Sequence, residues 1–510
     1  MKLTRHSRFI LALAVVAMLG CSGGGSPSST SNPPPQNPAP TTIPGVFRAN
    51  QATQAATTRG LPSSAGGTVT INMGTPRVYH SAVKMTNGDL MIIGGDTYGT
   101  GAFPVASTEI FHAEHEGFSP AGDMTTPRVL ASAARLSDGR IVVLGGVASI
   151  VADPFAIDVY DHGVWSKAPC TEINQRDAFP CPGAAFGLPK GKLLYYGGAS
   201  WAPILPAPIP IEFHNPRLID TTKTPWEVKT LSTDPIHHRT NFASLTLHDG
   251  RVLITGGGTE INTGDNAVIL FDPKTETFRF GRMASSRIRH GMVQHVDGKV
   301  QLYGGLGAWN QNVGTYTHET SVETYDPDTN TSSKVGDLRQ GLAMMGSNLL
   351  QHGETLHGGG PDKDGHASTQ QITYNYKTNI SLFSTQMLTP RNYFVSVALN
   401  NGRVAYIGGM TTSTVLSSAE IFDSYSAIMI NTPSDSLKLG QSMQVDLVSG
   451  GSVDWSCTKN VGEISGTGLY KAPAPVDPAS GNEDPTFVIL TATSKADPQN
   501  KVSVTLSLVP

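Results

Sequence analysis

The chain has 510 residues, of which 15% are charged, and it contains 55 glycines and 35 prolines. This composition favours a turn-rich all-β protein over a helical one, and the length suits a large repeat body with a smaller module. The formal net charge is -4, or -7 without the three basic residues that precede position 9, so no global positive field would attract nucleic acid. We therefore expect no nucleic-acid partner.

The N-terminus has the features of an export signal. Lys2, Arg5 and Arg8 precede an apolar run that ends at Leu19 and is too short to span a membrane. The following segment, Met18-Leu19-Gly20-Cys21, resembles the bacterial lipobox, whose Cys becomes the lipidated first residue of the mature protein. A plain cleaved leader with an incidental Cys is the alternative.

This resemblance implies that residues 1–21 are a lipoprotein signal peptide and that Cys21 is the site of lipid attachment. Residues 22–66 are rich in Ser, Pro and Gly, which is typical of a disordered tether. We expect an exported bacterial lipoprotein of the outer membrane or cell surface that touches the membrane only through its lipid.

The central part of the chain repeats one pattern seven times. In each copy an Arg opens an apolar-rich run, a turn ending in Gly reverses the chain, a second apolar run ends in a Gly-Gly pair, and a third run closes on an aromatic residue. The period is about 50 residues, as in arrays whose unit is a four-stranded sheet. The Gly pairs are Gly94-Gly95, Gly145-Gly146, Gly197-Gly198, Gly256-Gly257, Gly304-Gly305, Gly358-Gly359 and Gly408-Gly409. The arginines are Arg77, Arg128, Arg176, Arg239, Arg287, Arg339 and Arg391, and the closing aromatics are Phe111, Tyr160, Phe213, Phe271, Tyr325, Tyr374 and Phe422.

The strand count predicts how this array closes. A fourth strand is expected after six of the third strands, but no strand-like run follows Phe422 directly. Residues Thr68 to Met73 alternate in polarity and precede the first repeat, so they should supply the missing outer strand. Closure leaves no long exposed sheet edge, so we expect a closed ring over residues 67–427.

Each repeat resembles a kelch motif, with its Arg, its Gly pair and an aromatic-Asp turn such as Tyr325-Asp326-Pro327. The resemblance covers about 360 residues and implies a seven-bladed β-propeller. The tryptophan usual after the aromatic-Asp turn is present only as Trp165 and Trp226.

The period disappears after residue 427, and short alternating runs separated by Gly, Pro and Asn predict a small all-β sandwich over residues 428–510. The segment from Gly462 to Pro473, which follows Trp455, resembles bacterial Ig-like modules. The predicted fold class is therefore all-β, a seven-bladed kelch-type β-propeller followed by a small Ig-like β-sandwich.

Three cysteines lie beyond the leader. Cys170 and Cys181 are close in sequence, so in an oxidising compartment we expect them to form a disulfide. Cys457 is left over, and the alternating polarity around it predicts a buried, unreactive thiol.

The seven arginines are the first candidates for a binding site, because a ring of guanidinium groups near the mouth of a central channel would hold a carboxylate. The structural alternative is that ion pairs occupy them. Four third strands carry an acid two residues before the closing aromatic, namely Glu109, Asp158, Glu323 and Glu420. We therefore expect Arg176, Arg239 and Arg339 to be the freest and treat them as ligand-binding candidates.

The variable loops after the Gly pairs should emerge at one mouth of the channel, where a rigid ring usually carries its function. Four aromatics lie in them and are ligand-binding candidates for a carbohydrate or protein: Trp201, Trp309, Tyr98 and Tyr316. They would stack on sugar rings, grip a partner or cover one another. Neither His237-His238 nor the run from Asp362 to His366 has convincing ligand spacing, so we expect no metal.

A kelch propeller followed by an Ig-like domain is similar to the galactose oxidase group of copper radical enzymes, and Tyr79-His80 resembles their Tyr-His ligand pair. The pair lies in the first repeat, however, and in the last repeat Tyr393 is followed by Phe394. Residues 428–510 contain no His, although those enzymes take a ligand from that domain. If Cys170 and Cys181 bond to each other, the propeller also has no free Cys for a Tyr-Cys crosslink. We therefore expect no copper and no other cofactor.

We expect a lipid-anchored propeller that binds a carbohydrate, peptide or protein at its loop-rich mouth, because no nucleophile-base pair or metal triad stands out. One alternative is an enzyme acting on sugars, either galactose oxidase-like or resembling the kelch sialic-acid mutarotases, whose arginines would hold a carboxylate. The other is a purely structural surface protein.

Overall fold

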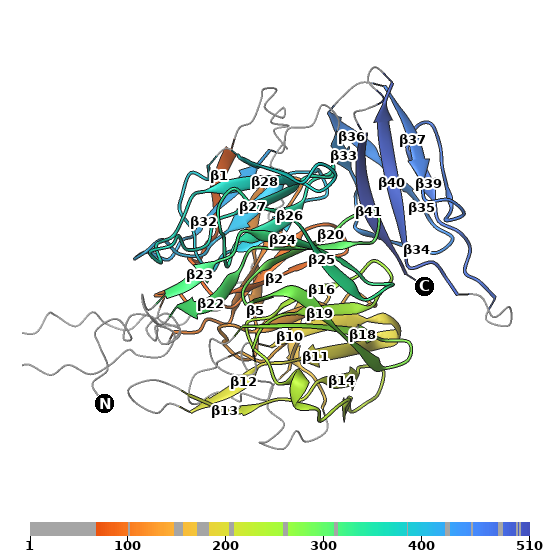
Figure 1. Cartoon of the computed structure of the whole chain (residues 1–510). Coiled ribbons are helices and arrows are strands. Elements are labelled where there is room, and N and C mark those ends of the chain that lie inside the picture. The colour runs from red at the N-terminus through yellow and green to blue at the C-terminus, as the bar shows by residue number, and fades with distance from the viewer. Residues whose placement is uncertain are drawn as a thin grey trace, which may run out of the picture.

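A computed structural model describes residues 68–99, 103–146, 157–170, 183–202, 209–258, 264–310, 315–384, 386–423, 429–449, 452–477, 483–495, 498 and 501–509. These residues form an all-β protein of short antiparallel sheets (Figure 1). The predicted signal peptide, lipid-attachment residue Cys21 and tether all lie outside them. No helix in the described part of the chain is long and apolar enough to cross a membrane.

Seven four-stranded antiparallel sheets follow one another in the described residues between Thr68 and Phe422. The first four, each written from its first strand outward, are β2 (Ser81–Lys84), β3 (Leu90–Ile93), β4 (Ser107–His112), β5 (Gly117–Asp123); β6 (Ser132–Arg135), β7 (Ile141–Leu144), β8 (Asp158–Asp161), β9 (Val164–Lys167); β10 (Ala184–Leu188), β11 (Lys192–Tyr196), β14 (Arg217–Asp220), β15 (Glu227–Thr230); and β16 (Ala243–Thr246), β17 (Val252–Thr255), β18 (Asp265–Asp272), β19 (Thr277–Arg287). The other three are β20 (Gly291–Gln294), β21 (Val300–Tyr303), β24 (Ser321–Asp326), β25 (Thr331–Asp337); β26 (Gly346–Leu349), β27 (Thr355–Gly358), β28 (Gln371–Asn375), β29 (Ile380–Phe383); and β30 (Val395–Ala398), β31 (Val404–Ile407), β32 (Ser418–Phe422), β1 (Thr68–Asn72).

The first strand of each sheet is the innermost, as predicted. The inner strands pack successively against one another, β2 on β6, β6 on β10, β16 on β20, β20 on β26 and β26 on β30. The second strands are buried along almost their whole length, and all four residues of the apolar strand Leu90–Ile93 are buried. Both faces of each sheet are therefore covered by neighbouring sheets, which stabilises the array through apolar burial.

The Gly pairs connect each sheet to the next. Gly94 and Gly95 have φ of +62° and +96°, and a Cβ on Gly94 would lie 2.6 Å from the carbonyl oxygen of Arg128. The N–H of Gly95 donates to that same carbonyl at 2.8 Å. Only glycine combines this backbone conformation with so close an approach. Equivalent bonds run from Gly198 to Arg239, Gly257 to Arg287, Gly360 to Arg391 and Gly409 to Arg77.

The N-terminal strand closes the array. β1 pairs antiparallel with β32, with Thr68 opposite Phe422 and Asn72 opposite Ser418. The N–H of Gly409 donates to the carbonyl of Arg77 at 2.8 Å, so the last sheet is also tied to the first repeat. This confirms the prediction that the segment before the first repeat supplies the outer strand of the last sheet.

Two repeats differ from the prediction. In the third repeat, Phe213 does not end the third strand of the sheet; it ends β13 (Ile209–Phe213), which pairs with β12 (Ala199–Ala202) as an inserted hairpin. A second inserted hairpin joins β22 (Leu306–Asn310) and β23 (Thr315–His318). In the sixth repeat the pair with positive φ is Gly359-Gly360 and not Gly358-Gly359, because Gly358 belongs to β27.

The C-terminal residues form separate sheets with their own core. The strands are β33 (Met429–Asn431) with β36 (Asp446–Ser449); β34 (Ser436–Lys438), β41 (Lys501–Val509), β40 (Phe487–Ser494) and β37 (Val453–Cys457); and β35 (Ser442–Gln444), β39 (Leu469–Lys471) and β38 (Glu463–Ile464). Ile430, Tyr470, Val488 and Leu506 belong to the buried cluster that joins these sheets. Figure 1 shows them on one side of the propeller, away from the β12–β13 and β22–β23 hairpins.

The closing strand generates the first prediction. Deleting residues 1–74 should lower the melting temperature strongly, because it removes β1 and leaves the long edge of β32 unpaired. Deleting residues 1–66 is the matched control and should leave it unchanged. Two truncated proteins that melt together in differential scanning calorimetry would contradict a closing role for β1.

Candidate functional site

Five of the seven predicted arginines, which we call the repeat arginines, are completely or almost completely buried. Each Nη1 donates to the carbonyl oxygen of the first Gly of its own pair, 17 residues further along the chain, at 2.7–2.9 Å. The repeat arginines are Arg77, Arg128, Arg239, Arg287 and Arg391. They lie just before the inner strands begin, in the connections between sheets or, for Arg287, at the end of β19, and their side chains are buried.

The predicted acids are the partners of four repeat arginines. Glu109, Asp158, Glu323 and Glu420 bind Arg77, Arg128, Arg287 and Arg391 respectively, at 2.6–3.2 Å. Each acid also accepts backbone N–H groups from the connection, as Glu323 does from Ala284 and Ser285. Burial lowers the pKa of Arg77, and the hydrogen bond and charge of Glu109 oppose that change. These arginines are structural.

The three arginines that we expected to be free have different positions. The prediction for Arg239 is wrong, because its Nη2 lies 3.1 Å from Oδ2 of Asp265. Arg339 is exposed, and its guanidinium carbon lies over the ring of Phe383, 5.8 Å from the ring centroid. Its repeat position is taken by Leu342, whose carbonyl accepts from Gly305 at 2.7 Å. Arg176 lies outside the described residues.

A second set of residues, two positions after each repeat arginine or Leu342, forms what we call the inner ring. All have a left-handed backbone with φ of +52° to +58°, which is unusual for residues other than Gly. The N–H groups of Leu130, Arg289 and Met344 donate to the carbonyls of Tyr79, Asn241 and Arg289 respectively, each at 2.9 Å. The described members are Tyr79, Leu130, Asn241, Arg289, Met344 and Tyr393, and all are partly exposed.

Arg289 is the charged member of the inner ring. Its Nε donates to Oδ1 of Asn241 at 3.0 Å, and its Nη1 lies 3.3 Å from Sδ of Met344. No carboxylate pairs with it among the described residues. A guanidinium that is held in place on one edge and lacks an acidic partner on the other is suited to an external carboxylate.

Two tyrosines, Tyr79 and Tyr316, interact electrostatically with this guanidinium. The rings of Tyr79 and Tyr393 lie 4.7 Å apart between centroids. Burial raises the pKa of Tyr79, and burial raises that of Tyr316 to about 12, while the charge of Arg289 acts against both shifts. Tyr79 and Tyr316 therefore remain neutral hydroxyls near neutral pH.

The predicted loop aromatics are only partly brought to this ring. Tyr316 packs on the buried cluster of Ile288 and Ala343, the neighbours in sequence of Arg289 and Met344. Trp309 pairs with Tyr316 across the β22–β23 hairpin, and Trp201 is opposite Pro210 across β12–β13. The side chains of both tryptophans lie outside the described residues.

The remaining predicted residues lie elsewhere. Tyr98 is 71% exposed, and its ring centroid lies 4.8 Å from that of Phe103. Tyr98 therefore covers a neighbouring aromatic, which is one of the alternatives that the sequence leaves open for the loop aromatics. Cys170 is half-buried, and burial raises the pKa of its thiol to about 11. Because Cys181 lies outside the described residues, the disulfide between them stays a prediction. Cys457 is half-buried with a raised pKa, and its thiol contacts the carbonyl of Gly462.

Comparison with known proteins shows a shared fold. No protein-family model and no curated protein matches the sequence. Among solved structures, the chain is similar to a fungal alcohol oxidase of the AA5 family in complex with copper, with a TM-score of 0.61 and 14% identity over 88% of this chain and 99% of that one. This likeness supports the predicted β-propeller and galactose oxidase-like architecture.

The copper in that oxidase requires a test of the donor groups here. The ring of His80 lies between sheets, because a Cβ on Gly408 would meet its Cε1 at 2.8 Å and a Cβ on Gly95 would meet its Cβ at 2.9 Å. Phe394 fills the same position beside Gly359 and Gly409, so this position serves packing. Burial lowers the pKa of His80 to about 3. The described residues contain no group of three His, Cys, Asp or Glu that could hold a metal.

The repeat arginines generate the second prediction. Arg287→Met should lower the free energy of unfolding by about 3–5 kcal/mol, because Glu323 stays buried without its cation. Arg339→Met, at an exposed position of the neighbouring repeat, should change it by less than about 0.5 kcal/mol. Urea unfolding followed by tryptophan fluorescence measures both. Equal effects would contradict the structural role of the repeat arginines.

Proposed function

We propose that the chain is a seven-bladed kelch-type propeller with an Ig-like sandwich that binds an acidic carbohydrate at the inner ring. The observation that carries this proposal is the partly exposed guanidinium of Arg289, which is held by Asn241 and has no carboxylate partner among the described residues. A uronic or sialic acid presents such a carboxylate on a pyranose ring. Arg binds a carboxylate through two parallel N–H groups, which fixes its orientation.

The surroundings of Arg289 suit the rest of a sugar. The tyrosines of the inner ring, Tyr79 and Tyr393, supply ring faces for the apolar side of a pyranose and hydroxyls for its polar edge. Backbone hydrogen bonds between successive members hold the ring in place before a ligand arrives. A preformed site loses little conformational entropy on binding.

The same geometry favours binding over acid-base catalysis. General acids and bases work best with a pKa near the operating pH, and burial raises the pKa of Tyr79 away from that range. The charge of Asp96 also raises the pKa of Tyr79. The carboxylate of Asp96 is buried and accepts three backbone N–H groups of its own loop, so its hydrogen bonds are used within the protein. A sugar-modifying enzyme is the second candidate, because the galactose oxidase-like architecture belongs to an AA5 oxidase in the solved structure above.

A lipid at Cys21 and a tether over residues 22–66 complete the proposal. A flexible tether of this length lets the propeller present its loop-bearing side to ligands near the surface to which the lipid attaches it. The loop-bearing side is the one away from the C-terminal sheets, which Figure 1 shows with the β12–β13 and β22–β23 hairpins.

The third prediction tests the ligand site. Arg289→Gln should weaken binding of a glucuronic acid-containing disaccharide at least tenfold in isothermal titration calorimetry, because two charge-assisted hydrogen bonds are lost. Arg289→Lys keeps the positive charge but lacks the paired N–H groups of the guanidinium, so it should lose an intermediate part of the binding affinity.

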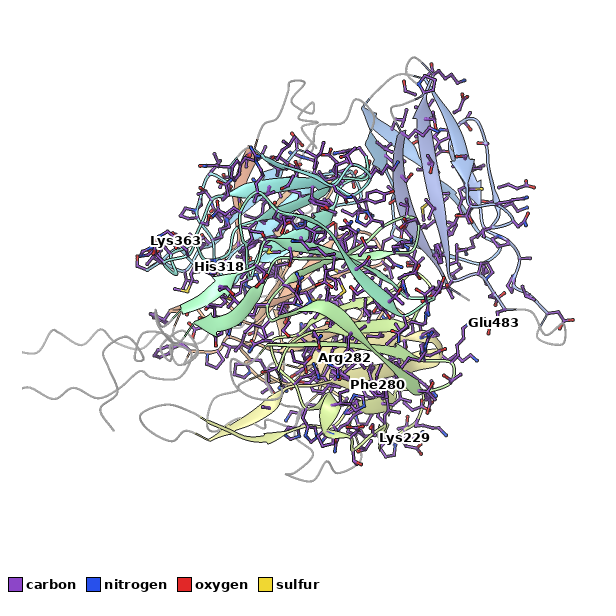
Figure 2. The ribbon with its side chains drawn as sticks, viewed as in Figure 1. Lys229, Phe280, Arg282, His318, Lys363 and Glu483 are labelled. Atoms are coloured by element: carbon purple, nitrogen blue, oxygen red, sulfur yellow. The ribbon has the colours of Figure 1, made fainter. Side chains whose placement is uncertain are left out.

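The matched control is Arg282→Gln, which should leave binding unchanged. Arg282 is an exposed arginine, labelled in Figure 2, on β19, the outer strand of its sheet. Equal affinity for the neutral glucose analogue, or full affinity in Arg289→Gln, would disprove the proposed site.

The fourth prediction concerns the anchor. Cys21→Ser should move the protein from the membrane fraction to the soluble fraction of a bacterial host, because the lipidated residue is gone. Ser22→Ala next to it should leave the protein in the membrane fraction. Membrane retention of the Cys21 variant in cell fractionation would refute lipid attachment.

A further inference from the structure

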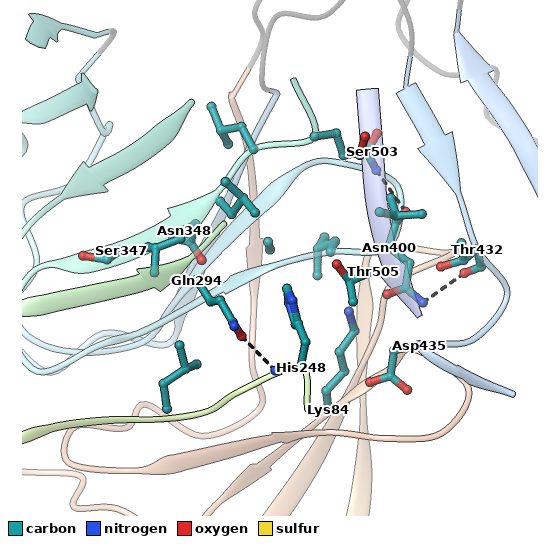
Figure 3. Close-up of a pocket in the computed structure, with 18 of the residues that line it drawn as sticks. Lys84, His248, Gln294, Ser347, Asn348, Asn400, Thr432, Asp435, Ser503 and Thr505 are labelled. Carbon is teal, nitrogen blue, oxygen red and sulfur yellow. Dashed lines mark hydrogen bonds between the residues drawn. The ribbon is translucent and has the colours of Figure 1, made fainter. Parts of the chain in front are cut away.

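A cavity of about 330 Å³ lies at the other end of the propeller, beneath the C-terminal sheets (Figure 3). Its walls come from the ends of the inner strands β2, β16, β20, β26 and β30 and from the residues that follow them, and its roof comes from β41. The cavity is distinct from the inner ring, since none of the ring members lines it.

Hydrogen bonds between the two parts of the chain fix this roof. Gln351 accepts from the N–H of Ile430 and donates to its carbonyl, both at 2.7 Å. The N–H of Ser503 donates to the carbonyl of Gln351 at 2.8 Å, and Nδ2 of Asn400 donates to the carbonyl of Thr432 at 2.9 Å. The cavity is therefore built by side chains and backbone that are already held in position.

Lys84 is the unusual residue in this cavity. It ends β2 and lines the cavity, and among the described residues its ammonium group has no hydrogen-bond or ion-pair partner. Asp435 lies in the same cavity, but its carboxylate is paired with Arg135 at 3.0 Å. In Figure 3 the Lys84 side chain extends between His248 and Asp435.

The charges around Lys84 do not balance. Lys84 and Arg135 are two cations that share the single carboxylate of Asp435, which leaves one positive charge in this group uncompensated. Burial lowers the pKa of Lys84, and Arg135 adds to this effect while Asp435 opposes it. His248 is neutral near neutral pH, because burial lowers its pKa, and its Nδ1 is buried without a partner among the described residues. An anion in the cavity would supply the missing charge.

We propose that this cavity binds a small hydroxylated carboxylate, with Lys84 as the counter-charge. One uncompensated cation matches a monoanion better than phosphate, and Arg135 is already occupied. The hydroxyl of Thr505 and Oδ1 of Asn400 have no protein partner among the described residues and face the same cavity, so they can bind ligand hydroxyls. Leu245 and Met292 line the remaining wall and suit the carbon skeleton.

The volume suits a small ligand. The space is sufficient for a hydroxy acid or a monosaccharide acid of about ten non-hydrogen atoms. Exposed Thr246 marks the place where the cavity meets solvent.

The fifth prediction tests this site on the whole chain by titration calorimetry with lactate and gluconate, and with glucose and inorganic phosphate for comparison. Lactate or gluconate should bind, glucose should not, and Lys84→Met should weaken the carboxylate affinity at least tenfold. Lys334→Met, on the exposed strand β25, should leave it unchanged.

Arg289→Gln is a second control, because it alters the inner ring and should leave binding in this cavity intact. Loss of binding in the cavity is thereby distinguished from loss of binding at the inner ring. Thr505→Val gives a second test without changing charge and should weaken gluconate more than lactate. Absence of carboxylate binding, binding of phosphate alone, or full carboxylate affinity in Lys84→Met would each overturn the proposal.

Discussion

The structure depends on one repeated interaction, in which each repeat arginine joins three segments of chain. Its guanidinium binds the carbonyl of a Gly pair and, in four repeats, an acid of the third strand. Its own carbonyl accepts the N–H of the Gly pair in the preceding sheet, as Arg128 does from Gly95. Because the cation is buried, losing these partners would leave its charge uncompensated, so the relative position of neighbouring sheets is strongly constrained.

The inner ring follows from this constraint. Two residues after the repeat arginine the backbone must turn from the connection into the inner strand, and it does so through a left-handed residue such as Tyr79 or Arg289. Non-Gly residues in this conformation are costly and persist only where the surroundings hold them. The arginine contacts on one side and the ring hydrogen bonds on the other supply that restraint, so side chains of any chemistry can be presented at the axis.

The repeat count and the closing strand were predictable because Gly pairs and Gly-containing turns impose local conformations that the sequence displays directly. The sixth Gly pair was misplaced since three glycines, Gly358 to Gly360, follow one another and only the 17-residue distance to Leu342 fixes the register. Phe213 was misassigned because a strand in an inserted hairpin has the same pattern as a strand of the sheet.

The site was harder to predict than the fold. Arg289 follows the repeat arginine Arg287 by two positions, and residue type alone does not distinguish the buried guanidinium from the partly exposed one. The difference arises at Arg289, whose own backbone is left-handed. A pattern search for a charged residue two positions after the repeat arginine would have found it. Lys84 gave no such signal, since its cavity exists only where residues 503 to 505 return to the propeller.

The two ends of the propeller axis now have a common electrostatic property. The chain carries a formal net charge of -4, so its field as a whole repels anions. Arg289 and Lys84 are local exceptions, each a cation without an acidic partner in the described structure. A partly buried charge in a concave, low-dielectric site is screened less than a charge on the open surface, so each acts strongly on a nearby ligand. The net negative charge then discourages non-specific anion binding elsewhere, and selectivity for the axis arises from the protein as a whole.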